Sequence, residues 1–227
     1  MPGVRPAGEG LGEVAGRMTY SVKEAYYTLQ GEGAQTGRAA VFLRFAGCNL
    51  WSGLERDRAN AVCKFCDTDF VGVDGPGGGK FADAEVLARH VAALWPAEGG
   101  VRYVVCTGGE PLLQLDEFLI AALHRRGFEV GVETNGTIEA PASLDWVCVS
   151  PKSTAELKQL SGHELKLVYP QADAPPERFA HLAFKNFFLQ PMDGPDRKAS
   201  QDACIAYCLA NPTWRLSLQT HKLTGIP

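Results

Sequence analysis

The stretch AAVFLRFAGCNL, residues 39–50, decides the fold of this chain. Ala39–Phe45 is an almost continuous apolar run, and a strand with apolar side chains on both faces has to be covered on both faces. Such strands are typical of parallel sheets in α/β proteins. Gly47 and Cys48 follow the strand directly, so the first candidate functional residues lie where the strand ends.

Five further runs have the same character, and helical patterns lie between them. The predicted strands are Ala39–Phe45, Val101–Thr107, Phe128–Glu133, Asp145–Val149, Glu164–Tyr169 and Lys185–Leu189. The predicted helices are Asp83–Leu94, Leu113–Arg126, a short one near Ala155–Leu160, and Ser200–Leu209. This alternation predicts right-handed βα units. Six strands are too few for a closed eight-stranded barrel, so we expect an α/β fold with an open, partial parallel β/α barrel of about six strands.

Loops of unusual composition follow five of the predicted strands. They are Gly47-Cys48, Gly108-Gly109-Glu110-Pro111, Thr134-Asn135-Gly136, Ser150-Pro151-Lys152 and Gln190-Pro191-Met192-Asp193. The carboxyl ends of parallel strands share one edge of the sheet, and ligands bind at that edge. Such residues also occur in ordinary loops, but five of these loops on one rim favour a binding site. The Gly-rich segment 74–80 lacks the order of a phosphate loop and is interpreted as a linker.

The composition excludes several classes of protein. The 227 residues carry 22 Lys and Arg against 26 Asp and Glu, and they form no basic stripe, so we expect no nucleic-acid partner. No apolar run is long enough for a membrane span. Residues 1–17 lack the apolar segment of a signal peptide. We expect a disordered leader at 1–17, a single domain at 18–227 and a cytoplasmic location.

Seven cysteines occur without a secretory signal, which favours metal-binding or catalytic roles over disulfides. Three of them, Cys48, Cys63 and Cys66, have the spacing C-x14-C-x2-C. Three thiolates could hold a [4Fe–4S] cluster with one open iron position, which a small amino acid could chelate. Two alternatives remain open, a zinc site completed by His163 or Cys106 and a thioredoxin-type redox pair. The remaining cysteines are interpreted as buried apolar residues, namely Cys106, Cys148, Cys204 and Cys208.

The motif Cys63-Lys64-Phe65-Cys66, together with Gly108-Gly109-Glu110, resembles the radical S-adenosylmethionine (SAM) superfamily. More narrowly, the chain is similar to the 7-carboxy-7-deazaguanine synthase family of queuosine and 7-deazapurine biosynthesis. The motifs that carry this resemblance are YTLQGEG at 27–33, RFAGCNL at 44–50, CDT at 66–68, ETNG at 133–136 and QTHK at 219–222. The similarity runs from about Met18 to Pro227. It implies an abridged radical SAM fold whose enlarged cluster loop, residues 49–62, departs from the CxxxCxxC spacing of the wider superfamily.

The resemblance implies a carbon–nitrogen lyase. It would convert 6-carboxy-5,6,7,8-tetrahydropterin to 7-carboxy-7-deazaguanine with loss of ammonia, through hydrogen abstraction by a 5′-deoxyadenosyl radical and ring contraction. The implied cofactors are the [4Fe–4S] cluster, SAM and Mg²⁺. The implied partners are an external one-electron reductant such as flavodoxin and a second copy of the chain in a homodimer. Two other readings are another radical SAM enzyme, such as a glycyl-radical activase, and a non-enzymatic zinc-binding module.

The same resemblance assigns the site residues. The cluster is expected on Cys48, Cys63 and Cys66, and the magnesium ion on Thr68. The expected SAM-binding residues are Phe65, Cys66, Asp67, Gly109, Ser150, Pro151, Lys152, Gln190, Pro191, Met192 and Asp193. The expected substrate-binding residues are Leu29, Gln30, Gly31, Arg44, Thr107 and the terminal Pro227, with His221 a weaker candidate. An arginine in an apolar strand is costly unless it is paired, and its planar fork suits a carboxylate. From the sequence alone, Phe65 is also suited to loop packing, Gly109 to a turn and Lys152 to a solvated surface.

Overall fold

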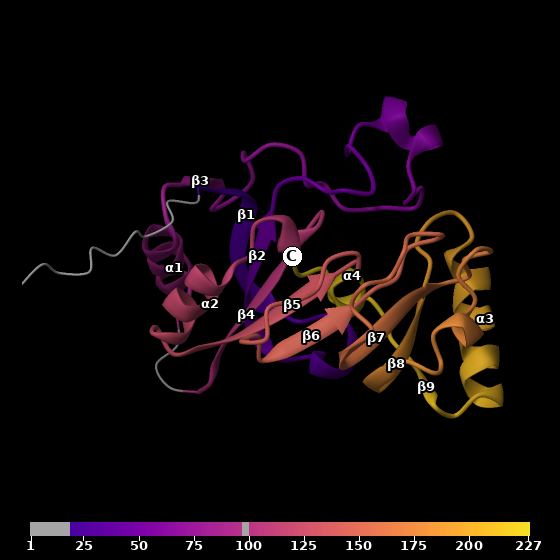
Figure 1. Cartoon of the computed structure of the whole chain (residues 1–227). Helices are drawn as coiled ribbons and strands as arrows, with labels where there is room; N and C mark the ends of the chain where they lie inside the picture. Colours follow the sequence, from indigo (N-terminus) through magenta and orange to yellow (C-terminus); the bar gives the residue numbers. More distant parts are fainter. Residues whose placement is uncertain (1–18, 97–99) are drawn as a thin grey trace, which may run out of the picture.

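The computed structural model describes residues 19–96 and 100–227, and the expected leader at 1–17 lies outside them. One sheet of nine strands runs through this part of the chain (Figure 1). Its order is β3-β1-β2-β4-β5-β6-β7-β8-β9. The strands are β1 (Tyr20–Leu29), β2 (Ala39–Phe45), β3 (Gly79–Phe81), β4 (Arg102–Gly108), β5 (Phe128–Thr134), β6 (Trp146–Val149), β7 (Ser161–Tyr169), β8 (Ala183–Pro191) and β9 (Trp214–Leu216).

The six predicted strands are confirmed, and they lie side by side as the parallel segment from β2 to β8. The order begins at β3 and ends at β9 without closing, so the expected open architecture is also confirmed. Three further strands extend it. The strand β1 pairs antiparallel with β2 and β3, whereas β9 continues the parallel segment. The two edge strands β3 and β9 have three residues each, too few for a recognisable apolar run.

Two of the helices begin at aspartates that cap them. The helix α1 (Ala84–Ala93) follows Asp83, which accepts a hydrogen bond from the Val86 N–H, and α2 (Glu117–His124) follows Asp116, which accepts one from the Leu119 N–H. Such caps satisfy backbone donors that the first turn leaves free. The helix predicted from residue 113 therefore begins later, after the short 3₁₀ turn η3 (Pro111–Leu113).

The C-terminal half holds α3 (Arg197–Ala210), which confirms the prediction there, and the short α4 (Thr220–Thr224). The helix predicted near 155–160 is wrong. The Lys158 and Gln159 N–H groups donate to the Gly136 carbonyl, so they are not used in a helical turn. The remaining 3₁₀ turns are η1 (Gly33–Gln35), η2 (Glu55–Asn60) and η4 (Pro176–Arg178). No helix in the described ranges is long and apolar enough to span a membrane.

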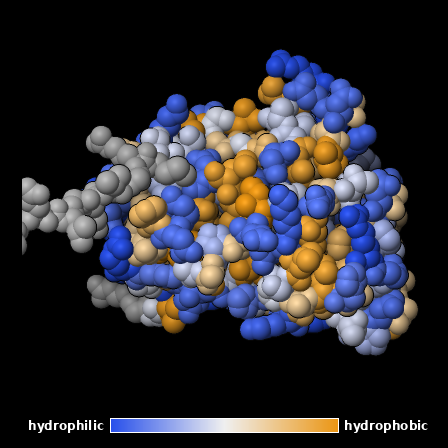
Figure 2. Space-filling model, in the orientation of Figure 1, coloured by the Kyte–Doolittle hydropathy of each residue, from blue (hydrophilic) through white to orange (hydrophobic). Residues whose placement is uncertain are grey.

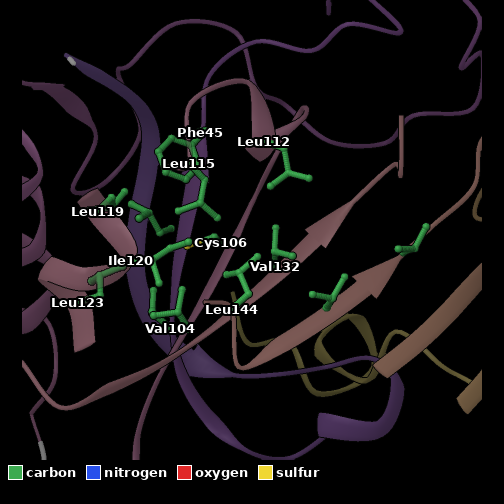
Figure 3. Packing of buried hydrophobic residues seen from close by; sticks show 14 of the residues in the cluster. Phe45, Val104, Cys106, Leu112, Leu115, Leu119, Ile120, Leu123, Val132 and Leu144 are labelled. Carbon is green, nitrogen blue, oxygen red and sulfur yellow. The ribbon is translucent and has the colours of Figure 1, made fainter. Parts of the chain in front are cut away.

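The main core lies between the sheet and the helices α1 and α2 (Figure 3). Leu119, Ile120 and Leu123 of α2 are fully buried against side chains of the central strands, among them Val104 and Cys106. Burial of one such side chain contributes about 1.5–3 kcal/mol. The helices pack on the face of the sheet, so the carboxyl ends of the strands remain available for a site.

The cluster loop and segment 74–80 differ in how they meet the sheet. The η2 part of the cluster loop projects at the upper right of Figure 1, and Figure 2 shows hydrophilic residues over it. Segment 74–80 is not the free linker that we predicted. The Ala25 N–H donates to the Pro76 carbonyl at 2.8 Å, the Gly75 N–H donates to the Lys23 carbonyl at 2.9 Å, and the end of the segment enters β3.

Candidate functional site

A cavity of about 390 Å³ opens at the carboxyl ends of the parallel strands, and four of the five rim loops contribute residues to its lining. It includes Gly108 and Gly109 at the end of β4, Thr134 and Asn135 at the end of β5, and residues 190–193 at the end of β8. Pro227, the last residue, also lines it, and Figure 1 places the C-terminus near the middle of the sheet. The structure therefore brings the predicted loops together around one cavity.

Nearly all of the residues assigned from the sequence line this cavity. They are Leu29, Gln30, Gly31, Arg44, Cys63, Phe65, Cys66, Asp67, Thr68, Thr107, Gly109, Ser150, Lys152, Gln190, Pro191, Met192, Asp193 and Pro227. The weaker candidate His221 lines it as well. Pro151 is buried behind the rim, and Cys48 lies beside the cavity without lining it.

Cys63 and Cys66 line this cavity, and Cys48 lies beside it. The interaction between the Cys63 and Cys66 thiols lowers the pKa of Cys66 and raises that of Cys63. Burial raises the pKa of Cys48, with a smaller contribution from the nearby Cys66. A Cβ atom at Gly109 would collide with the Gly47 carbonyl oxygen and with Cys48, so the β4 loop can approach Cys48 only because residue 109 is glycine.

Three cysteine thiols are donors of the kind that iron–sulfur clusters take. Among the described residues, no three His, Cys, Asp or Glu side chains form a group that could hold a single metal ion. The two side chains that could have completed a zinc site are engaged elsewhere. His163 stacks on Trp146 and its Nδ1 accepts the Val147 N–H, while Cys106 is fully buried in the main core.

Glu110 joins two of the rim loops, a role that the sequence analysis did not assign. Its carboxylate is fully buried and accepts hydrogen bonds from the Thr134 hydroxyl at 2.7 Å and the Asn135 N–H at 2.8 Å. Burial raises its pKa, and these donors oppose that rise. The Asn135 amide then donates to Asn49 Oδ1 at 2.9 Å, which extends the connection to the cluster loop.

The Lys152 side chain contacts other residues of the rim and is not a solvated surface lysine. Its Nζ donates to Ser150 Oγ at 2.6 Å and lies 5.8 Å from the centroid of the Phe65 ring. A cation at this distance from an aromatic face is attracted to it. The contact joins the loop after β6 to the segment between Cys63 and Cys66.

Arg44 is not the lone charge that the apolar strand suggested. Its register partner on β1 is Glu24, and Arg44 Nε donates to Glu24 Oε1 at 2.7 Å. That argument for Arg44 was wrong because the partner comes from a strand that the sequence analysis did not predict. Arg44 still lines the cavity, with Thr107 as its register partner on β4.

The sequence analysis missed a buried charge on the cavity wall. Lys166 on β7 lines the cavity with a side chain that is 4% exposed, and it pairs with Glu32 and Glu133. The signal was present in the sequence, because the run ELKLVY places a lysine among apolar residues just as AAVFLRF places an arginine. The cost of burying an unpaired charge applies equally to both.

The C-terminal segment closes one side of the cavity. The Thr220 N–H and hydroxyl both donate to the Gly31 carbonyl, and the Thr28 hydroxyl donates to a Pro227 oxygen at 2.9 Å. Lys222 pairs with Asp67, which follows Cys66, at 2.7 Å and with Asp193 after β8 at 2.6 Å. The segment is thereby attached to β1, to the residue after Cys66 and to the end of β8.

The chain is similar to known proteins in both sequence and structure. A family model described as "Radical SAM superfamily" matches residues 57–206. The chain is 67% identical over 210 residues to the 7-carboxy-7-deazaguanine synthase of Caulobacter vibrioides and equally to that of Bordetella pertussis, with 92% of this chain and 100% of each relative covered. The crystal structure of QueE from Escherichia coli matches with a TM-score of 0.67 and 29% identity, over 90% of this chain and 96% of that one.

Proposed function

Because the chain belongs to the radical SAM superfamily and, within it, to the 7-carboxy-7-deazaguanine synthases, we propose that it converts 6-carboxy-5,6,7,8-tetrahydropterin to 7-carboxy-7-deazaguanine with loss of ammonia. The reaction would supply queuosine and 7-deazapurine biosynthesis. One observation supports this proposal above the others: one cavity is lined both by two of the cluster cysteines and by Arg44, whose side chain is 17% exposed.

The family uses a [4Fe–4S] cluster and SAM, which supply the radical that removes a hydrogen atom from the substrate. In this chain Cys48, Cys63 and Cys66 would hold the cluster. The SAM-binding residues would be Phe65, Cys66, Asp67, Gly109, Ser150, Pro151, Lys152, Gln190, Pro191, Met192 and Asp193. The absence of a side chain at Gly109 lets the backbone approach the amino acid part of SAM, and the buried Glu110 fixes the loop that carries it.

The substrate would lie between the SAM site and the C-terminal segment. Arg44 would bind its carboxylate, with Glu24 holding the guanidinium in place through Nε. Thr107 would add a hydroxyl beside Arg44, and Leu29, Gln30 and Gly31 would contact the ring edge. Pro227 would also contact the substrate, since it lines the same cavity. A closed site of this kind excludes water from a reactive intermediate.

The finer assignments follow the same proposal. Thr68 would contribute its hydroxyl to a Mg²⁺ ion that the substrate carboxylate shares, since this ion takes oxygen ligands and commonly keeps several waters. The electron would come from an external one-electron reductant such as flavodoxin. The chain would act as a homodimer in the cytoplasm.

The test is anaerobic turnover of the iron-loaded protein with SAM, a reductant and the carboxylated tetrahydropterin. We expect 5′-deoxyadenosine release that depends on the pterin, and a product with the mass of 7-carboxy-7-deazaguanine. Cys63→Ala should abolish both. Cys208→Ala is the matched control, because this cysteine lies on α3 away from the cavity lining. SAM cleavage that the pterin leaves unchanged would overturn the proposal.

A further inference from the structure

The buried lysine Lys166 lies between two carboxylates on the cavity wall. Its Nζ is 2.6 Å from Glu32 Oε2 and 3.2 Å from Glu133 Oε1, and the exposed fractions of the two carboxylate side chains are 14% and 22%. All three residues line the cavity. They come from β7, from the turn after β1 and from β5, so the sheet brings them together.

Simple stability is a weak reason for such a cluster. Removing charges from water costs several kcal/mol per ion, and well-packed apolar residues often replace a buried ion pair without loss. One ammonium also cannot neutralise two carboxylates, so the cluster presents net negative charge to the cavity. A function at the cavity wall accounts for both features.

The lysine keeps the Glu32 carboxylate ionised. Burial by itself would raise the pKa of Glu32, but the charge of Lys166 and hydrogen bonds from Lys166 and Gln219 outweigh it and lower this pKa to about 2. Burial likewise opposes the charge of Lys166, but Glu133 and Glu32 raise its pKa above the ordinary value. An ionised carboxylate only accepts hydrogen bonds, so this wall is a set of acceptors.

One acceptor is left for a ligand. Glu133 Oε1 receives the Gln30 amide at 2.9 Å and Lys166 at 3.2 Å, whereas Glu133 Oε2 receives no hydrogen bond from the described residues. The two oxygens of Glu32 face Gln219 Nε2 at 3.0 Å and Lys166. The second oxygen of Glu133, on a side chain that is 22% exposed, is therefore free to accept a hydrogen bond from a ligand in the cavity.

Charge fixes the orientation of a ligand that carries a carboxylate. Arg44 lies on β2 and Glu133 on β5, with β4 between these strands. A ligand carboxylate is attracted to Arg44 and repelled by the pair Glu32 and Glu133. The opposite edge of the ligand then meets the carboxylates, and that edge must carry N–H groups.

We propose that Lys166 is a positioning residue for specificity: it holds Glu32 and Glu133 as charged acceptors that select a ring with a 2-amino group and an adjacent ring N–H over the 2-oxo analogue. The inference rests on the proposed function, because it assumes a carboxylated pterin in this cavity. Replacing the amino group by an oxo group turns a donor into an acceptor, which two carboxylates reject.

The test compares two ligands on the holoenzyme by anaerobic titration in the presence of SAM. These are 6-carboxy-5,6,7,8-tetrahydropterin and its 2-oxo, lumazine-type analogue. We expect the wild-type protein to prefer the pterin about 10- to 100-fold, as for a hydrogen bond to a charged group. In Lys166→Met the preference should fall to about threefold or less, while the dissociation constant of SAM changes less than about twofold. Lys166→Arg should keep the preference, because it keeps the charge between the carboxylates.

The matched control is Lys198→Met, which removes an exposed lysine paired with Asp202 on α3 and should leave both affinities unchanged. If Lys166→Met does not fold, Glu133→Gln decides instead, since it keeps the shape and removes the charge. A variant that folds and keeps the wild-type preference overturns the inference. Wild-type protein that does not turn over the pterin overturns the proposed function, so the two failures are distinguishable.

Discussion

Lys166 and Lys222 make the same set of contacts in two different surroundings. Each pairs with two carboxylates, Lys166 at 2.6 and 3.2 Å and Lys222 at 2.7 and 2.6 Å. The Lys166 side chain is 4% exposed and that of Lys222 is 30% exposed. The N···O distances therefore do not distinguish the two clusters. The exposure of the lysine side chain to solvent does.

The surroundings decide what each cluster contributes. In a buried site the attraction between charges is strong, and a charge that loses its partner is costly. At the surface, water and salt weaken the attraction, and a pair contributes about 0–1 kcal/mol. We infer that Lys166 holds the cavity wall, whereas Lys222 fastens the C-terminal segment lightly to Asp67 and Asp193.

Removing the buried lysine should have the largest effect. We expect Lys166→Ala to lower the free energy of unfolding by about 3–5 kcal/mol, because two carboxylates then remain buried without a partner. Anaerobic urea denaturation of the iron-loaded protein at neutral pH measures this change. Lys166→Arg should recover most of the loss. A loss below about 1 kcal/mol would equal that of a surface ion pair and would contradict the distinction between the two clusters.

Lowering the pH should give the second largest difference in stability between the two clusters. The pKa of Glu32 is lowered from its ordinary value of 4.5 to about 2, so its stabilising effect is present above pH 4.5 and is lost as the pH falls towards 2. The raised pKa of Lys166 keeps that residue charged throughout this range. The groups that face Glu32 are Lys166, Gln219 and His221. We expect Glu32→Gln to be less stable than wild type at pH 6, and the difference to shrink as the pH falls below 4.5.

The measurement is urea denaturation of the metal-free chain between pH 6 and 3. Asp193→Asn is the matched comparison at the exposed cluster. The pKa of Asp193 is lowered mainly by its hydrogen bond from Lys222, so the sign of its pH dependence is the same. Its effect should be smaller because water screens the pair. Equal effects at the two positions would contradict the distinction between the clusters.

The smallest expected effect is the loss of stability on removing Lys222, and high salt should abolish it. Lys222→Met is expected to cost less than about 1 kcal/mol of stability in dilute buffer and almost nothing at about 1 M salt, where charges are screened within about 3 Å. The cost of Lys166→Met should persist at high salt, because the ions do not reach a buried pair. Denaturation midpoints at the two salt concentrations measure both changes. A salt-sensitive Lys166→Met would place its cluster in contact with solvent.

The sequence predicted the centre of the fold well and its margins poorly. The apolar run Ala39–Phe45 becomes β2 with the same bounds, because a strand covered on both faces leaves a local signal. The ten-residue β1 mixes apolar with polar and charged residues without a regular period, and it was not predicted. The stretch near 155–160 has a helical pattern, but its backbone donors are taken by Gly136, which follows a distant strand.

Some residues of the candidate site could be predicted from the sequence, and others could not. Cys63, Cys66 and Gly109 could be singled out because motif spacing and glycine are written in the chain itself, and the structure places them on one cavity. The partners of Arg44 and Lys166 could not be singled out. A charged pair across strands depends on register, and register depends on the packing of the whole sheet.

The sequence by itself determined a parallel α/β core, a rim of polar loops and three cysteines spaced for a cluster, because each of these follows from neighbours along the chain. Only the tertiary structure decided that Glu24 meets Arg44 and that Glu32 and Glu133 meet Lys166. The physical reason is that the strength of a charged contact depends on its burial and its partners. Both arise only when strands distant in the sequence lie side by side.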